Sequence, residues 1–135
     1  MPVSEPTRAL RVAIVDDEPS VRLSLRRLCT VLGMEATAYA SGNLFLDSLL
    51  NSVIADCVLL DMHMPEMSGL EVQRRLASFT DRVAVIAITA DDSPETRVRW
   101  LTGGALACLR KPVGADEIAA LPTTVFEWQA RSRVA

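Results

Sequence analysis

The sequence is poor in aromatic residues, has no excess of basic charge and contains no long hydrophobic run. Aromatic side chains make up 4% of the 135 residues while half are hydrophobic, so the core must consist mainly of aliphatic side chains. The net charge of −3 argues against general binding to nucleic acid or anionic lipid, because both need a basic surface. No apolar stretch approaches the roughly 18 residues that span a bilayer, so we expect no membrane insertion.

The number and spacing of the cysteines do not indicate a disulfide framework. Cys29, Cys57 and Cys108 each lie in an apolar run, their number is odd, and no CxxC spacing occurs. This usage favours buried thiols in a reducing compartment. Residues 1–10 lack the hydrophobic region of a signal peptide. We therefore expect a cytoplasmic protein that is not secreted.

The length predicts one domain with no second folded module, since a typical domain has roughly 100 to 200 residues. The expected organisation is a flexible N-terminal tail at 1–9, a folded domain at 10–130 and a C-terminal tail at 131–135. No internal repeat interrupts this domain.

Five short apolar segments have the composition of buried strands. Consecutive aliphatic or β-branched positions are typical of a strand that is covered on both faces. The predicted strands are 11–16, 35–40, 56–61, 83–89 and 105–110.

Helical patterns separate these strands, and Ser, Pro and Gly mark their ends. Glycine can end a helix because it accepts the left-handed conformation, and proline fits a first turn. Ser68 and Glu71 form a Ser-x-x-Glu capping box before a helix at 69–78. The last helix should begin near Ala115, and Pro122 predicts a kink or restart within it. The other helices are expected after Pro19 as far as Gly33, after Ser41-Gly42, and from Ser93-Pro94 to Gly103-Gly104.

Alternating strands and helices predict a parallel five-stranded sheet with helices on both faces, a doubly wound α/β fold with right-handed crossovers. All strands of such a sheet end at one edge, where ligands bind. We expect the residues that end four of the strands to converge there: Asp16, Asp17, Asp61, Thr89 and Lys111.

This set of residues predicts a cation site. Three carboxylates around the only lysine repel one another, by on the order of 4 kcal/mol for each pair about 4 Å apart at an effective dielectric of 20. A hard divalent cation, Mg²⁺, suits several carboxylate and carbonyl oxygens, and an all-oxygen site argues against zinc.

The same residues suit phosphoryl transfer. Aspartate can act as a nucleophile, while Lys111 and Thr89 would supply a positive charge and a hydrogen bond to phosphoryl oxygens. Three methionines in the loop after Asp61 are more simply packing residues than a copper site.

Four motifs resemble the receiver domain of two-component response regulators, with a chemotaxis-regulator-like, flavodoxin-like fold. The resemblance covers residues 10–121, with the motifs in the order and spacing of the family, and it implies the strand order 2-1-3-4-5. The motifs are Val15-Asp16-Asp17-Glu18, Leu60-Asp61-Met62-His63-Met64-Pro65-Glu66-Met67-Ser68-Gly69, Ile88-Thr89-Ala90 and Leu109-Arg110-Lys111-Pro112.

The resemblance implies a role for each site residue. Asp61 would accept the phosphoryl group from a sensor histidine kinase or a phosphotransfer protein. Asp17, Asp61 and the backbone carbonyl of His63 would ligate Mg²⁺, with Asp16 acting through water. Thr89 and Lys111 would contact the phosphoryl oxygens, and the Lys111-Pro112 bond is often cis in this family.

The resemblance also implies how the protein would act. It would catalyse only its own phosphorylation and dephosphorylation, in a bacterial phosphorelay, and would signal to a downstream protein by a conformational change. A homodimer through the fourth helix, fifth strand and fifth helix is a candidate assembly. Both a stand-alone regulator and part of a longer protein fit the sequence.

Two other classes share parts of this pattern. A pseudo-receiver binding module has the fold without phosphorylation, but it normally lacks the acidic pair, the acceptor or the lysine, and all are present here. A haloacid-dehalogenase-type phosphatase also uses an aspartyl nucleophile with Mg²⁺. That class needs an acid two residues after the nucleophile, where this sequence has His63, which we interpret as a side chain at the mouth of the pocket that tunes the access of water.

The sequence departs from the family at a position that couples the site to the protein surface. Receivers usually carry Tyr or Phe three residues before the lysine, and this sequence has Cys108. We expect the coupling between site and surface to be weaker, or to use another element such as Trp100 or the break at Pro122.

Overall fold

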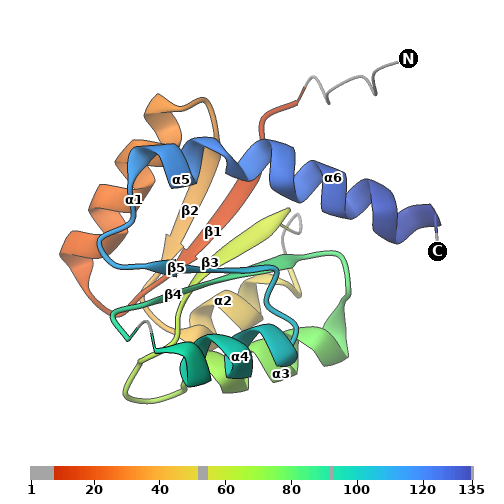
Figure 1. The fold of residues 1–135 in the computed structure, drawn as a ribbon. Helices are drawn as coiled ribbons and strands as arrows, with labels where there is room; N and C mark the ends of the chain where they lie inside the picture. The colour runs from red at the N-terminus through yellow and green to blue at the C-terminus, as the bar shows by residue number, and fades with distance from the viewer. Residues whose placement is uncertain (1–7, 52–54, 92, 135) are drawn as a thin grey trace.

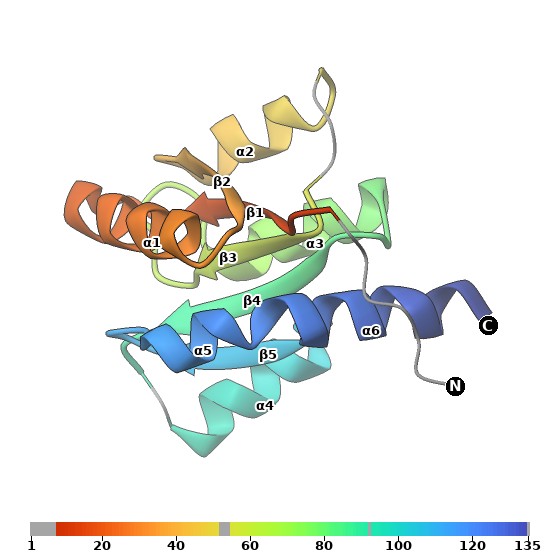
Figure 2. The ribbon, with the colours of Figure 1, turned by 90° about the horizontal axis from the view of Figure 1, so that it is seen from above.

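The computed structural model describes residues 8–51, 55–91 and 93–134, which form a five-stranded parallel sheet between two layers of helices (Figures 1 and 2). The strand order is β2-β1-β3-β4-β5, so the doubly wound fold and its order are confirmed. The strands are β1 (Arg11–Val15), β2 (Glu35–Tyr39), β3 (Cys57–Asp61), β4 (Ala84–Thr89) and β5 (Ala107–Arg110).

Figure 2 shows the helices on the two faces of the sheet, α2, α3 and α4 on one and α1, α5 and α6 on the other. This arrangement follows from connections that alternate strand and helix. The helices are α1 (Pro19–Val31), α2 (Gly42–Ser48), α3 (Gly69–Phe79), α4 (Pro94–Thr102), α5 (Ala115–Ala119) and α6 (Leu121–Val134).

Each face of the sheet has its own apolar core, because successive strand residues point to opposite sides. Leu60 of β3 packs in the core under α2, α3 and α4, with Phe45 and Trp100. Leu59 packs in the other core with Leu25 of α1. All three cysteines are buried, as expected from the sequence.

Serine residues begin three of the helices. The hydroxyl oxygens of Ser41, Ser68 and Ser93 accept hydrogen bonds from backbone amides in the first turns of α2, α3 and α4. At α3 the Ser68 half of the predicted capping box is present, while the Glu71 carboxylate pairs with Arg74 and Arg75. These caps satisfy amides that a helix itself leaves unpaired.

The last helical segment confirms the predicted restart and corrects the predicted tail. α5 ends at Ala119, and Pro122, which has no N–H, is the second residue of α6. α6 then continues to Val134, well into the stretch 131–135 that we expected to be a tail. The reason is local: no glycine or proline follows Pro122, and Ser132 donates a hydrogen bond to the carbonyl of Trp128 within the helix.

The fifth strand is shorter than expected. It begins at Ala107 instead of Ala105 because the Ala105 amide donates to the Trp100 carbonyl and closes the end of α4. Gly104, with φ +112°, makes this turn possible.

A cluster of polar contacts around Asp56 joins both ends of the chain to the amino edge of the sheet. The Asp56 carboxylate accepts hydrogen bonds from the Arg8 guanidinium at 2.7 and 2.8 Å, from the Arg11 amide at 2.8 Å and from Gln129 at 3.0 Å. The guanidinium also lies 5.0 Å from the ring centroid of Phe126. Arg8 is therefore held in place, although the sequence assigned it to a flexible tail at 1–9, of which 1–7 lie outside the described residues.

Candidate functional site

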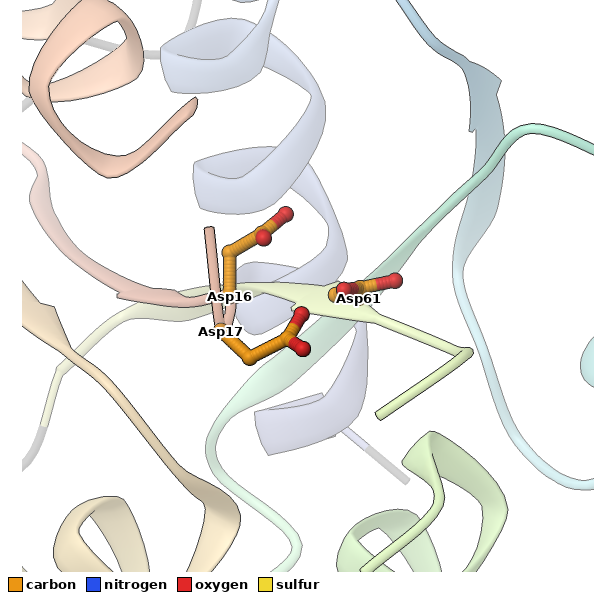
Figure 3. Close-up of side chains that lie close together, drawn as sticks. All are labelled: Asp16, Asp17 and Asp61. Atoms are coloured by element: carbon orange, nitrogen blue, oxygen red, sulfur yellow. The ribbon is translucent and has the colours of Figure 1, made fainter. Parts of the chain in front are cut away.

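Three carboxylates meet at the carboxyl edge of the sheet (Figure 3). Asp16 and Asp17 directly follow β1, and Asp61 is the last residue of the neighbouring strand β3. One oxygen from each carboxylate lies within 4.8 Å of the others. The predicted convergence of the acidic residues is confirmed.

Lys111 reaches the same cluster from the end of β5. Its Nζ lies 2.8 Å from Asp16 Oδ2 and 3.6 Å from Asp61 Oδ2. Its backbone amide donates to the Thr89 carbonyl at 2.9 Å, which fixes the residue beside β4. Burial alone would lower the pKa of Lys111, but its hydrogen bond to Asp16 and the nearby acidic charges raise it, so the side chain is a cation.

Asp61 is a buried carboxyl with an unusual pKa. Only 3% of the residue is exposed, and its Oδ1 accepts a hydrogen bond from the His63 amide at 3.1 Å. Burial, together with the charge of Asp16 and the proximity of Asp17, raises the pKa of Asp61 to about 6, although the His63 amide and Lys111 act in the opposite direction. The site thus holds more negative charge than Lys111 neutralises.

Asp16 is positioned by contacts that the sequence did not indicate. Its Oδ1 accepts from the Glu18 amide at 2.9 Å, and its backbone carbonyl accepts from the Arg22 guanidinium at 2.7 Å. The signal was weak but present, because Arg22 lies one turn into α1, directly after the acidic pair.

Thr89 ends β4 and is 1% exposed. Its hydroxyl oxygen accepts a hydrogen bond from the Asp91 amide at 3.0 Å. The Asp91 carboxylate in turn accepts from the Ser93 amide and the Thr96 hydroxyl at the start of α4, each at 3.0 Å. A hydroxyl has one proton and two lone pairs, so Thr89 can accept from Asp91 and still donate toward the site.

The donor set fits a hard divalent cation. Asp16 and Asp61 are buried, Asp17 is exposed, and all offer oxygen atoms. Carboxylates that are close together and out of water repel one another strongly unless a cation lies between them. The raised pKa of Asp61 is a direct sign of that repulsion and burial. An oxygen-only set with an exposed side suits Mg²⁺, which retains several waters.

The loop after Asp61 contributes packing and one exposed ring. Met62 and Met64 are buried in the core, as the packing interpretation predicted. His63 is exposed, and its ring lies edge-on to Trp100 at 6.1 Å between centroids. The role of the His63 carbonyl as a ligand stays a prediction. The Lys111-Pro112 bond is cis, as the resemblance implied.

The fold and the site together define a flavodoxin-like α/β domain with an acidic, lysine-bearing site at the carboxyl edge of its sheet. The sequence matches the response regulator receiver domain over residues 12–121. The chain therefore belongs to the receiver domain family of two-component response regulators.

Relatives and solved structures agree with this assignment. The chain is 40% identical over 111 residues to "Response regulator MprA" of Mycolicibacterium vanbaalenii, and 32% identical over 111 residues to "Response regulator protein TodT" of Pseudomonas putida. Each match covers 82% of this chain and 48% of the relative, so the chain spans about half the length of the curated relatives it matches. A response regulator receiver protein from Burkholderia phymatum has a TM-score of 0.77 and 41% identity, over 87% of this chain and 95% of that one.

Receiver domains are not enzymes in the ordinary sense. Within the part of the chain that the structure describes, no helix is long and apolar enough to cross a membrane.

Proposed function

We propose that this chain is the phosphoacceptor of a two-component system and that Asp61 takes the phosphoryl group. An Asp61 carboxylate oxygen forms the new O–P bond while the P–N bond to the donor histidine breaks, and the imidazole leaves. Water later attacks the phosphorus of the acyl phosphate, the O–P bond to Asp61 breaks, and inorganic phosphate leaves, which restores the carboxylate. Both steps take place within the receiver itself, which is why it acts as a switch instead of turning over a substrate.

A single observation carries this assignment: Asp61 is a buried carboxyl that faces a lysine at the carboxyl edge of the sheet, with Nζ of Lys111 3.6 Å from Oδ2. Its other oxygen is oriented by the His63 amide. The carboxylate is thus held in one orientation, with a positive charge on the side where negative phosphoryl oxygens would arrive.

The acidic residues would hold Mg²⁺. Asp17, Asp61 and the backbone carbonyl of His63 are the proposed direct ligands, and Asp16 would act through water. The bound ion neutralises charge on the phosphoryl oxygens. Asp16, which pairs with Lys111 at 2.8 Å, also holds the ammonium in place next to Asp61.

Lys111 and Thr89 are the proposed contacts of the phosphoryl oxygens. Lys111 provides a cation whose raised pKa keeps it charged over the whole physiological range. Thr89 provides a hydroxyl proton from a buried position at the end of β4. Preorganised donors of this kind stabilise negative charge without rearrangement at the moment of reaction.

The pseudo-receiver alternative gains no support, since the acidic pair, Asp61 and Lys111 lie together. The phosphatase alternative requires an acid where His63 lies. We further propose a cytoplasmic location, a sensor histidine kinase or phosphotransfer protein as donor, and a downstream protein as target. A second copy docking through α4, β5 and α5 is a further proposed partner.

Mass spectrometry of the intact protein tests the proposal. The full chain is incubated with acetyl phosphate and MgCl₂, and an adduct of about 80 Da, one phosphoryl group, is expected. The Asp61→Asn variant should show no adduct, and Asp47→Asn, an exposed acid on α2, is the matched control that should keep it. An adduct that persists in Asp61→Asn would refute the assignment.

A further inference from the structure

The indole ring of Trp100 connects the loop after Asp61 to the helix α4. Trp100 is 4% exposed, and its ring lies edge-on to the ring of His63, with 6.1 Å between centroids and 78° between planes. His63 in turn donates its backbone N–H to Asp61 Oδ1 at 3.1 Å. Two contacts therefore lead from the proposed phosphoacceptor to the last turn of α4.

Gln73 ties the same tryptophan to α3. This glutamine is 3% exposed, which is unusual for an amide side chain, and its Nε2 donates to the Trp100 carbonyl at 3.3 Å. Its amide also lies beside Gly103 and Gly104, at the turn that ends α4. Gln73 thereby fixes one end of α4 against α3.

This pair of residues has two buried polar atoms without partners. Among the described residues, neither Gln73 Oε1 nor Trp100 Nε1 has a hydrogen-bond partner. Such atoms are rare in a folded core because each has lost its water without compensation. The two are complementary, since the amide oxygen accepts and the indole N–H donates. A hydrogen bond between them would satisfy both atoms.

We propose that Trp100 carries the signal from Asp61 to α4, and that the Trp100 indole N–H and the Gln73 amide oxygen pair in the phosphorylated form. This inference rests on the proposed phosphorylation of Asp61. A phosphoryl group on Asp61 changes the atoms that the His63 amide faces, so the loop and the His63 ring shift. Trp100 follows the ring it contacts, and the new hydrogen bond holds α4 in its shifted position.

The physical requirement for such a switch is a difference in interaction energy between two states. The free form has the His63–Trp100 ring contact and two unpartnered polar atoms. The phosphorylated form gains a hydrogen bond in the core between the two atoms that the free form leaves unpartnered. Cys108 of β5 lies in the same core as Trp100. Strand β5 carries no aromatic ring, so none on this strand would block the movement of Trp100.

The indole N–H signals in a nitrogen-15 NMR spectrum test this proposal directly. The chain has two tryptophans, and a Trp128→Phe variant assigns the Trp100 signal. Beryllofluoride with MgCl₂ serves as the phosphoryl mimic, and fluorine-19 NMR reports its binding independently. On binding, the Trp100 indole signal should move and its hydrogen should exchange with water at least about fivefold more slowly, the lower end of typical coupling between sites. The Trp128 signal, from the opposite face of the sheet, should stay unchanged.

Three variants separate the steps. Gln73→Met keeps the length and volume of the side chain but has no amide, so beryllofluoride should still bind while the slower exchange is lost. Gln129→Met is its matched control on α6 and should keep the full response. His63→Ala, which retains the backbone carbonyl, should give a Trp100 signal that no longer changes when the mimic binds.

The outcomes that would overturn the inference are distinct from failure of the proposed function. Bound beryllofluoride with no change at Trp100 overturns the inference alone, as does an undiminished response in Gln73→Met or His63→Ala. Loss of the response in Gln129→Met as well would show a general loosening of the fold and would also overturn it. Absence of any bound fluorine signal in the wild-type protein overturns the proposed function and, with it, the inference.

Discussion

Lys111 Nζ lies closer to Asp16 than to Asp61, at 2.8 Å compared with 3.6 Å from the nearest carboxylate oxygens. The ammonium therefore neutralises the carboxylate beside the proposed phosphoacceptor more than the phosphoacceptor itself. In this position it competes with any cation that the acidic cluster binds. The same charge is available to a phosphoryl group once it arrives on Asp61.

Lys111→Met should consequently have opposite effects on two measurements. Mg²⁺ affinity, measured by calorimetry, should rise about tenfold, because a positive charge 2.8 Å from one carboxylate of the acidic cluster is removed. The yield of the acyl phosphate from acetyl phosphate should fall, since the phosphoryl oxygens lose a cation. Arg110→Met removes an exposed charge from the preceding residue and should change neither quantity appreciably. Unchanged or weaker Mg²⁺ binding in Lys111→Met would contradict the competition.

Asp17→Ala should weaken Mg²⁺ binding by about tenfold or more, because the ion loses a charged oxygen ligand from the exposed side of the site. Calorimetry is the suitable measurement, since neither tryptophan belongs to the acidic cluster. The matched control is Asp81→Ala, an exposed acid in the loop before β4. Equal affinities in the Asp17→Ala variant and the wild-type protein would remove Asp17 from the proposed ligands.

Gly69→Ala should both destabilise the protein and disturb the site. A Cβ at this position would lie 2.6 Å from the Cα of Met62 and 2.9 Å from the Asp61 carbonyl oxygen, so backbone atoms would have to move. We expect the free energy of unfolding in urea to fall by about 3 kcal/mol. Gly114→Ala, whose nearest contact is 3.5 Å away, should cost less than about 1 kcal/mol. Similar losses in both variants would show that the close approach of α3 to β3 is unimportant.

The sequence predicts the sheet and the acidic cluster because both are local patterns combined with one topological rule. Asp16, Asp61 and Lys111 each follow an apolar strand, and parallel strands bring such residues to one edge. Contacts between distant polar residues have no comparable signal. Arg8, Asp56 and Gln129 are separated by 48 and 73 positions, and nothing in their neighbourhood marks them as partners. The same holds for Gln73 and Trp100, which lie 27 positions apart in the sequence and meet through one hydrogen bond.

The predicted start of the fifth strand is wrong because a backbone amide has a partner outside the strand. The Ala105 amide turns to the Trp100 carbonyl, so β5 starts two residues late. The third strand begins at Cys57, one residue later than expected, although the backbone of Asp56 already bonds Arg11 and Ala84. A hydrogen bond that closes the end of a helix can thus delay the start of the next strand.

Asp56→Asn should lower stability by about 2 kcal/mol at neutral pH, because a charge-assisted pair of hydrogen bonds from Arg8 is weakened. Burial alone would raise the pKa of Asp56, but the hydrogen bonds from Arg8, Arg11 and Gln129 lower it below its ordinary value. Glu35→Gln is the matched control, since its ion pair with Arg11 is long, at 3.7 Å, and exposed. That change should cost less than about 0.5 kcal/mol.

The pH dependence of this contribution has a definite sign. A carboxyl with a lower pKa in the folded protein takes up protons more readily when unfolded, so stability falls as the pH falls. The difference in unfolding free energy between wild-type protein and Asp56→Asn should be constant above about pH 5 and shrink below about pH 4, the range of an ordinary aspartate. Urea unfolding at a series of pH values measures it. A difference that persists unchanged into strong acid would mean that Asp56 is not the group responsible.

Because residue 108 is a cysteine, we expect β5 and α5 to respond little to phosphorylation. The residue is buried in the core under α4, and its side chain has one heavy atom beyond Cβ. In typical receivers the aromatic ring at this position turns inward when the site is phosphorylated, and the surface around it changes with that rotation. A thiol cannot cover or uncover the same area, so a ligand at Asp61 gains no differential contact there.

We therefore expect small amide chemical-shift changes across residues 107–119 when beryllofluoride and MgCl₂ are added, and larger ones in the loops that follow Asp61 and Thr89. The contact from Thr89 through Asp91 to Thr96 carries the effect to the start of α4, and the ring of Trp100 carries it to the last turn of that helix. Cys108→Tyr should enlarge the response of β5 and α5 if the ring is accommodated, while Cys29→Ser, on the other face of the sheet, should not. A large, concerted change across 107–119 in the wild-type protein would show that another residue performs the aromatic's role on β5, and the prediction from Cys108 would then be wrong.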